Sequence, residues 1–96
     1  MAVYAIGAVS SVNVPAGSAA YQEKAGPTLA QYGGKLVAGG TNVEVMDGNW
    51  SPVGMVVIEF ESMDTAKTWY TSPEYSAAKP ERIRTANSGL IFLDAG

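Results

Sequence analysis

The chain of 96 residues contains no cysteine and no histidine. Without cysteine there are no disulfide bonds and no thiol chemistry, which is compatible with a reducing cytoplasm. Without either residue, the usual zinc sites and histidine-based acyl-transfer triads are excluded. Any catalysis must therefore use carboxylates, tyrosines, lysines or arginines, and we expect no metal and no organic cofactor.

Charge is also scarce, because charged residues make up 16% of the chain where about a quarter is usual. Six basic residues stand against nine acidic ones, which gives a net charge of −3. The basic residues are scattered singly, so the sequence offers no basic stripe for phosphate groups. We expect no nucleic-acid partner, and the low charge favours a protein partner.

Long apolar runs are missing as well. The N-terminal segment has no basic n-region, and Ser10, Ser11 and Asn13 interrupt its apolar residues. No run approaches the length that spans a membrane. We expect a soluble, cytoplasmic protein without a membrane partner. Because the composition does not change along the chain, we expect a single domain over residues 1–96.

The first third of the chain predicts a strand followed by a helix. Residues 3–12 are apolar on both parities, which is typical of a buried strand. Residues 15–32 show helical spacing, with apolar side chains at Tyr21, Ala25, Leu29 and Tyr32. Pro27 lies inside this helix and predicts a kink, and Gly33 suits a left-handed C-cap.

The middle of the chain predicts two antiparallel strands. A short strand over residues 35–38 ends at Gly39-Gly40, and residues 42–46 resume an extended pattern. Asp47-Gly48 is a hairpin signal, after which residues 54–60 form a third strand. We expect the second and third strands to pair antiparallel.

The last third predicts two short helices and a final strand. Ser62 suits the N-cap of the first helix, and Ser72 followed by Pro73 suits the start of the second. Pro80 lies inside the second helix and predicts a bend or fraying there. Residues 88–93 are apolar on both parities and predict the last strand.

The resulting order, β-α-β-β-α-β, is that of the ferredoxin-like α+β fold, in which an antiparallel sheet carries its helices on one face. Alternation in the third strand places Val56, Ile58 and Phe60 on one face, and Val57 and Glu59 on the other. One layer of helices covers only one face. We therefore expect a homodimer in which two sheets pack face to face, as in dimeric α/β barrels.

Eight short motifs, spread over almost the whole chain, carry a family resemblance. They are Tyr21; Pro27-Thr28; Tyr32-Gly33-Gly34; Gly39-Gly40; Glu44-Val45; Asp47-Gly48-x-Trp50; Val57-Ile58-Glu59-Phe60; and Ala66-x-x-Trp69-Tyr70-x-Ser72-Pro73-Glu74-Tyr75. In order and spacing they are similar to the family catalogued as domain of unknown function 1330 (DUF1330). The resemblance implies a dimeric α/β-barrel fold, related in architecture to small cofactor-free monooxygenases and isomerases. It implies no assigned biochemical role.

Two carboxylates are candidates for catalysis. Glu59 is the only acidic residue within the apolar run of the third strand, and loss of water around a carboxylate disfavours its charged form. It therefore suits a general acid or base, and Glu44 is the candidate for sharing its pocket. The alternatives are a structural Glu59, paired with Arg82 or Arg84 across the sheet or the dimer, and a solvated Glu44 on an edge strand.

Aromatic residues are the candidates for binding a small ligand. A planar apolar molecule is typically held by side chains of this kind, here Tyr21, Tyr32, Trp50, Trp69, Tyr70 and Tyr75, with Arg82 or Arg84 as an anion partner. The alternative is that these aromatic side chains form the core. Gly39-Gly40 lacks the strand-to-helix context of a phosphate site, so a bulge or turn is the better interpretation.

Two functions follow from these features. The first is the binding or transformation of a small apolar or aromatic molecule without a cofactor, with Glu59 as base. The second is a non-catalytic homodimeric module, in which polar residues fix the geometry of an interface. The absence of histidine and cysteine and the low charge favour the second, and the acid near many aromatic residues favours the first.

Overall fold

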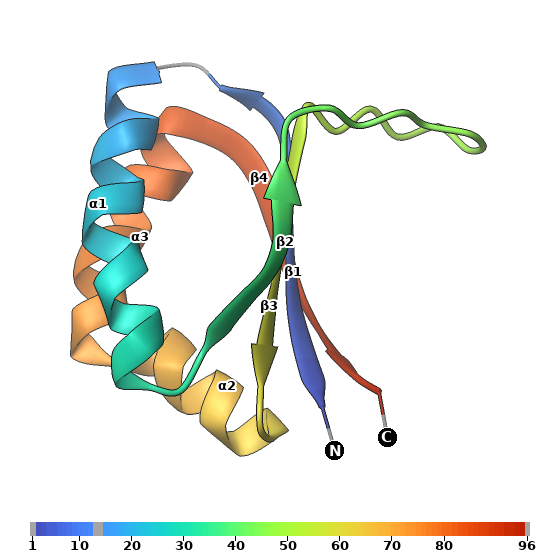
Figure 1. Cartoon of the computed structure of the whole chain (residues 1–96). Helices are drawn as coiled ribbons and strands as arrows, with labels where there is room; N and C mark the ends of the chain where they lie inside the picture. The colour runs from blue at the N-terminus through green and yellow to red at the C-terminus, as the bar shows by residue number, and fades with distance from the viewer. Residues whose placement is uncertain (1, 13–14, 96) are drawn as a thin grey trace.

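The structure is a computed structural model that describes residues 2–12 and 15–95, with side chains described for residues 2–11, 21–83 and 87–95. Seven elements follow one another along the chain (Figure 1): β1 (Val3–Val12), α1 (Pro15–Gln31), β2 (Lys35–Gly40), β3 (Gly54–Phe60), α2 (Met63–Thr71), α3 (Pro73–Thr85) and β4 (Ala86–Asp94).

The four strands form one sheet in the order β2-β3-β1-β4, and every neighbouring pair is antiparallel. All three helices lie on the same side of this sheet (Figure 1). The predicted ferredoxin-like α+β fold is confirmed, including the antiparallel pairing of the second and third strands. The opposite side of the sheet, which we call the open face, carries no helix.

Serine side chains set the ends of α2 and α3. The Ser62 hydroxyl accepts a hydrogen bond from the Thr65 backbone N–H at 3.1 Å, which caps α2. Ser72 follows α2, and its hydroxyl accepts from the Tyr75 N–H at 3.2 Å, while Pro73 begins α3. Both predicted helix starts are confirmed. Neither internal proline ends its helix, since α1 continues past Pro27 and α3 continues past Pro80.

The connection between β2 and β3 differs from the prediction. β2 continues through Gly39-Gly40, and residues 42–46 form no strand. Gly48 does adopt a left-handed turn conformation, with φ of 91°. However, residues 41–53 extend away from the sheet on the side opposite the helices (Figure 1). We call this segment the arm. Its two halves do not form the regular ladder of backbone hydrogen bonds that defines a pair of strands.

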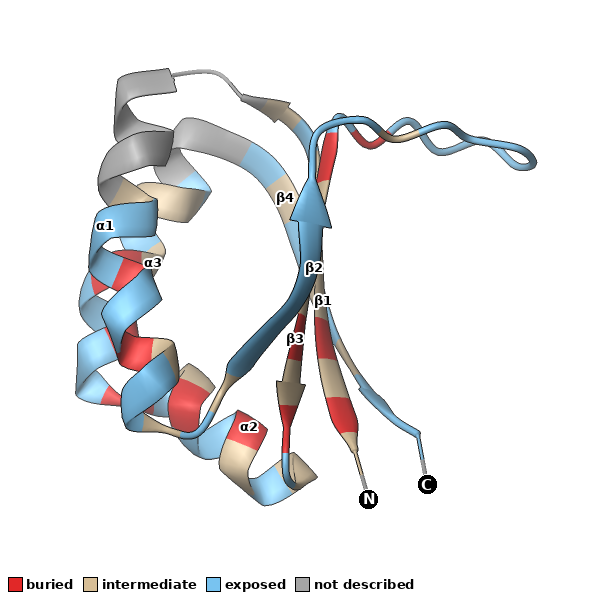
Figure 2. Ribbon diagram, viewed as in Figure 1, coloured by how far each residue is buried: buried red, intermediate tan, exposed pale blue. Residues whose placement is uncertain are grey.

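The core lies between the helices and the sheet, toward the end where β1 begins (Figure 2). Its buried apolar residues are Val3, Ala5, Ala25, Ile58, Phe60, Ala66, Trp69, Tyr75 and Ala78. Ile58 and Phe60 face the helices, as the alternation in the third strand predicts. Gly34 is needed beside them, because a Cβ atom there would lie 2.9 Å from the Phe60 ring. Among the described residues, no helix is long and apolar enough to cross a membrane.

A buried hydrogen bond joins α2 to α1 within this core. The Trp69 indole N–H donates to the Thr28 hydroxyl at 2.9 Å, and that hydroxyl donates to the Ala25 carbonyl at 2.6 Å. Both Trp69 and Thr28 are buried. The indole N–H therefore has a partner that only a hydroxyl at position 28 supplies.

Replacement of Thr28 by valine tests this bond, because valine keeps the shape but leaves the buried indole N–H unpaired. We expect the free energy of unfolding to fall by about 1–3 kcal/mol. Urea denaturation measures the change, and Thr28→Ser, which keeps the hydroxyl, is the matched control. Equal stability of the valine and serine variants would show that the hydrogen bond contributes nothing.

Candidate functional site

A cavity of about 280 Å³ lies between the helices and β4. It is lined by Tyr70 of α2, Arg82 of α3 and, from β4, Ser88, Gly89, Leu90 and Phe92. Ser88, Leu90 and Phe92 alternate along the strand, so their side chains share the face that is turned toward the helices. The cavity is therefore on the same side of the sheet as the core.

Glycine and aromatic residues shape this cavity. Gly7 of β1 pairs with Leu90 in the sheet and lets the Val56 side chain approach the backbone, since a Cβ atom at Gly7 would lie 3.0 Å from a Val56 methyl group. On the wall, the rings of Tyr70 and Phe92 meet edge to face, with centroids 6.1 Å apart. The cavity therefore combines aromatic and apolar side chains with the polar groups of Arg82 and Ser88.

Arg82 supplies the charge of the site. One terminal guanidinium nitrogen, Nη1, donates to the Ser88 hydroxyl at 3.1 Å. The Nε atom is buried and has no hydrogen-bond partner among the described residues. Most buried polar atoms in proteins have a partner, so an unpaired donor beside a cavity indicates a missing acceptor. Lys79 adds a second positive charge nearby, 4.3 Å from the centre of the Tyr70 ring.

A pair of tyrosine hydroxyls joins α1 to α3. The hydroxyls of Tyr21 and Tyr75 are 3.1 Å apart, and their rings meet edge to face. Burial, followed by the hydrogen bond to Tyr75, raises the pKa of Tyr21 well above its usual value, and the charge of Arg82 opposes this only in part. Tyr21 therefore stays protonated and can serve as a hydrogen-bond donor, but not as a base.

The remaining aromatic candidates are structural or distant from the cavity. The ring of Trp69 lies 4.2 Å from that of Tyr75 and 5.5 Å from that of Phe60, within the core. The Tyr32 hydroxyl donates to both carboxylate oxygens of Glu74, at 3.0 and 3.2 Å, on the surface. This hydrogen bond raises the pKa of Tyr32. Tyr32 thus joins the C-terminal end of α1 to α3.

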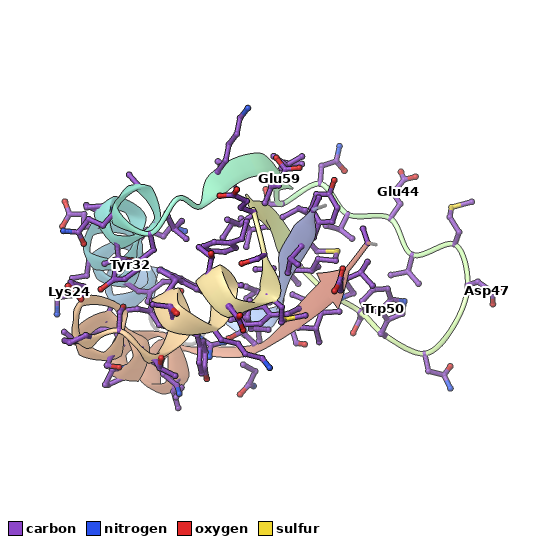
Figure 3. The ribbon with its side chains drawn as sticks, turned by 90° about the horizontal axis from the view of Figure 1, so that it is seen from below. Lys24, Tyr32, Glu44, Asp47, Trp50 and Glu59 are labelled. Atoms are coloured by element: carbon purple, nitrogen blue, oxygen red, sulfur yellow. The ribbon has the colours of Figure 1, made fainter. Side chains whose placement is uncertain are left out.

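The carboxylate candidates lie elsewhere (Figure 3). Glu59 is half-buried and belongs to the open face, where it stands opposite Lys35 and Tyr4 in the sheet. Glu44 and Trp50 are exposed on the arm. The cavity therefore contains neither carboxylate.

The proposed arginine partners of Glu59 also need revision. Arg82 lines the cavity on the helix side of the sheet and does not pair with Glu59 within the chain. The side chain of Arg84 lies outside the described residues. Within the described part of the chain, no three acidic side chains gather in a group that would hold a metal ion.

Sequence reasoning finds Tyr70 and Arg82 but misses the β4 lining. The signal that identifies it is the shared parity of Ser88, Leu90 and Phe92, combined with a strand that borders the helices. Of the ten candidate residues, the structure brings Tyr70 and Arg82 to the cavity and the Tyr21–Tyr75 hydroxyl pair close to the Arg82 charge.

Known structures share this fold. A protein of unknown function from Rhodopseudomonas palustris, RPA0582, is 23% identical, with a TM-score of 0.76 over 96% of this chain and 80% of that one. SnoaB from Streptomyces nogalater, a cofactor-independent oxygenase, is 13% identical, with a TM-score of 0.70 over 99% and 93%. A dimeric ferredoxin-like protein of unknown function from Jannaschia sp. CCS1 is 10% identical, with a TM-score of 0.72 over 99% and 100%.

These likenesses bear on the fold alone, because each identity is below 25%. A comparison with curated proteins finds no match. The family resemblance that the motifs carry is confirmed by a match over residues 2–95. The chain therefore belongs to the family described as Domain of unknown function (DUF1330).

Proposed function

We propose that this protein binds a small aromatic molecule that carries an anionic oxygen, in the cavity between α3 and β4. The observation that supports the proposal best is the buried Nε atom of Arg82, which has no partner among the described residues and belongs to a side chain that lines the cavity. A guanidinium group presents a planar set of donors that suits a carboxylate, phenolate or enolate.

The size and walls of the cavity support an aromatic ligand. Its volume of about 280 Å³ is at the lower end of the range for ligand pockets, which suits a molecule of one or two rings. Tyr70 and Phe92 offer ring faces and edges for stacking, and Leu90 adds apolar contact. No carboxylate is among the lining residues, so an anion entering the cavity meets no like charge there.

The same residues favour the anionic form of a bound molecule. Arg82 stabilises negative charge on a ligand oxygen. The cofactor-independent oxygenase SnoaB supports the idea that this fold hosts chemistry on small molecules without a cofactor. Glu59 is not part of the proposed site, because it lies on the open face.

Two matched probes test the proposal, 2-naphthoate and its neutral amide, 2-naphthamide. We expect the carboxylate to bind at least about tenfold more tightly, because a hydrogen bond to a charged group contributes about 1.5–3 kcal/mol. Isothermal titration gives both affinities, and amide chemical shifts of Ser88 and Gly89 report where each probe binds. Equal affinities, or shifts confined to the open face, would contradict the proposal.

A second function, a homodimeric module, is supported by the open face. Ile91 and Leu93 of β4 are exposed there, which is unfavourable for a chain alone in water. We propose that two open faces pack together, and the description of two neighbours with this fold as dimeric supports a pair. The two functions are compatible, since the cavity and the open face lie on opposite sides of the sheet. The cytoplasmic location, the single domain and the lack of a nucleic-acid partner stay predictions from the sequence.

A further inference from the structure

Most of the arm stands clear of both layers, and its end joins the sheet, where Pro52 is buried and the Val53 N–H donates to the Val9 carbonyl at 2.7 Å. In Figure 1 and Figure 3 the arm projects beyond the open face of the sheet. Its exposed apolar side chains include Val45, Trp50 and Val53, with Met46 at 88% exposure. Isolated apolar side chains on a surface are ordinary, but four on one projecting segment indicate a contact surface.

A hollow of about 270 Å³ lies at the base of the arm. Ala38, Gly40, Met55 and Val57 are among its lining residues, and they belong to the open face. A Cβ atom at Gly40 would have nothing within 4 Å, so this chain leaves the space empty. The hollow and the arm are thus two uncovered apolar features on the same side of the molecule.

The size of the open face shows why the arm matters. Four strands spaced about 4.8 Å apart and about seven residues long have a flat outline of roughly 19 by 23 Å. Stable protein interfaces bury about 800 Å² of accessible surface on each partner, so a four-stranded sheet of this size is a small contact area. The arm carries further exposed apolar side chains on the same side of the molecule and would enlarge that contact.

We propose that the arm packs on the open face of a second copy of this chain, with its apolar side chains against the hollow at the base of the partner's arm. A second copy is the occupant that fits, because each chain carries both the projecting residues and the hollow. In a dimer with two-fold symmetry, both arms and both hollows are then buried. In this dimer each arm lies against the sheet of the other copy, in addition to the contact between the two sheets. We call this arrangement the clasp.

The two tryptophans of the chain allow a direct test. Trp69 is 2% exposed and Trp50 is 57% exposed, so acrylamide quenches mainly Trp50 in the free chain. We expect quenching of the natural protein to fall as the concentration rises through the dissociation constant of the dimer. Analytical ultracentrifugation on the same samples measures that constant.

Variants of the arm and of the hollow separate the clasp from simple packing of two sheets. Trp50→Ala is expected to weaken the dimer at least about tenfold, as for an aromatic residue central to an interface. Gly40→Ala places a methyl group in the hollow, with nothing of its own chain within 4 Å, and is expected to weaken the dimer as well. The control is Ile83→Ala, which removes a side chain that is 63% exposed on α3 and should leave the constant within twofold.

Each alternative result would overturn the proposal. A dimer in which Trp50 stays as quenchable as in dilute protein would show that the arm is free. An unchanged dissociation constant for Trp50→Ala would likewise show that the arm does not contact the second copy. A chain that stays monomeric at all concentrations would show that there is no second copy for the arm to bind. In the Trp50→Ala variant, Trp69 is the remaining tryptophan, and its emission reports whether the core is intact.

Discussion

Replacement of Tyr75 by alanine is expected to lower the free energy of unfolding by about 3–5 kcal/mol, the usual effect of removing a large buried ring. Tyr75 is fully buried, and its ring centroid lies within 6.3 Å of those of Tyr21, Trp69 and Tyr70. Small domains are stable by about 5–15 kcal/mol, so this single change removes a large share of the total.

Two controls separate the contributions of Tyr75. Tyr75→Phe keeps the ring and removes only the hydroxyl bound to Tyr21, so we expect a loss of about 1 kcal/mol. Ile83→Ala, on the exposed face of the same helix, should change stability by less than about 0.5 kcal/mol. Chemical denaturation of the three variants measures the differences. A loss below about 1.5 kcal/mol for Tyr75→Ala would mean that this cluster is not the centre of the core.

Replacement of Arg82 by methionine is expected to weaken the binding of 2-naphthoate by about 10- to 100-fold, because the ligand loses its charged partner. Stability should change little in the absence of a ligand. Among the described residues, the arginine donates a hydrogen bond to Ser88, but its Nε atom is buried without a partner. A methionine of similar length avoids that cost, so we expect a net change within about 1 kcal/mol.

The combination of these two results distinguishes a binding residue from a structural one. Titration gives the affinity for 2-naphthoate, and thermal unfolding without a ligand gives the stability. Arg82→Lys is the matched variant, since it keeps the charge but loses the planar set of donors, and it should recover only part of the affinity. If Arg82→Met strongly destabilises the protein and leaves the affinity of the folded fraction unchanged, the role of Arg82 is structural.

Much of the fold follows from local patterns in the sequence. Alternation in the third strand predicts which side chains meet the helices, and Ile58 and Phe60 are indeed buried there. Ser62 and Ser72 predict the starts of α2 and α3, because a serine hydroxyl just before a helix accepts a hydrogen bond from a backbone N–H of the first turn. Such features depend on only a few neighbouring residues, so a single sequence reveals them.

The candidate site depends on longer-range relations. Arg82 reaches the cavity because α3 continues past Pro80, whereas the local rule predicts a bend or fraying there. The cavity exists because Tyr70, Arg82 and the β4 residues Ser88, Leu90 and Phe92, which come from three different elements, meet in the fold. The pattern of residues 42–46 resembles a strand, yet in the structure this segment forms none. Whether a cavity or a projecting arm forms depends on which segments, distant in the sequence, do not pack against each other. The local sequence pattern does not contain that information.

The edge strand β2 has a consequence for aggregation. All six of its residues are exposed, which makes an open strand edge that foreign chains could extend. Three features oppose this: the charge of Lys35, the register shift between Leu36 and Ala38, and the weak strand propensity of Gly39-Gly40. The protein can thus present an apolar sheet face to one specific partner while its edge remains a poor template for fibrils.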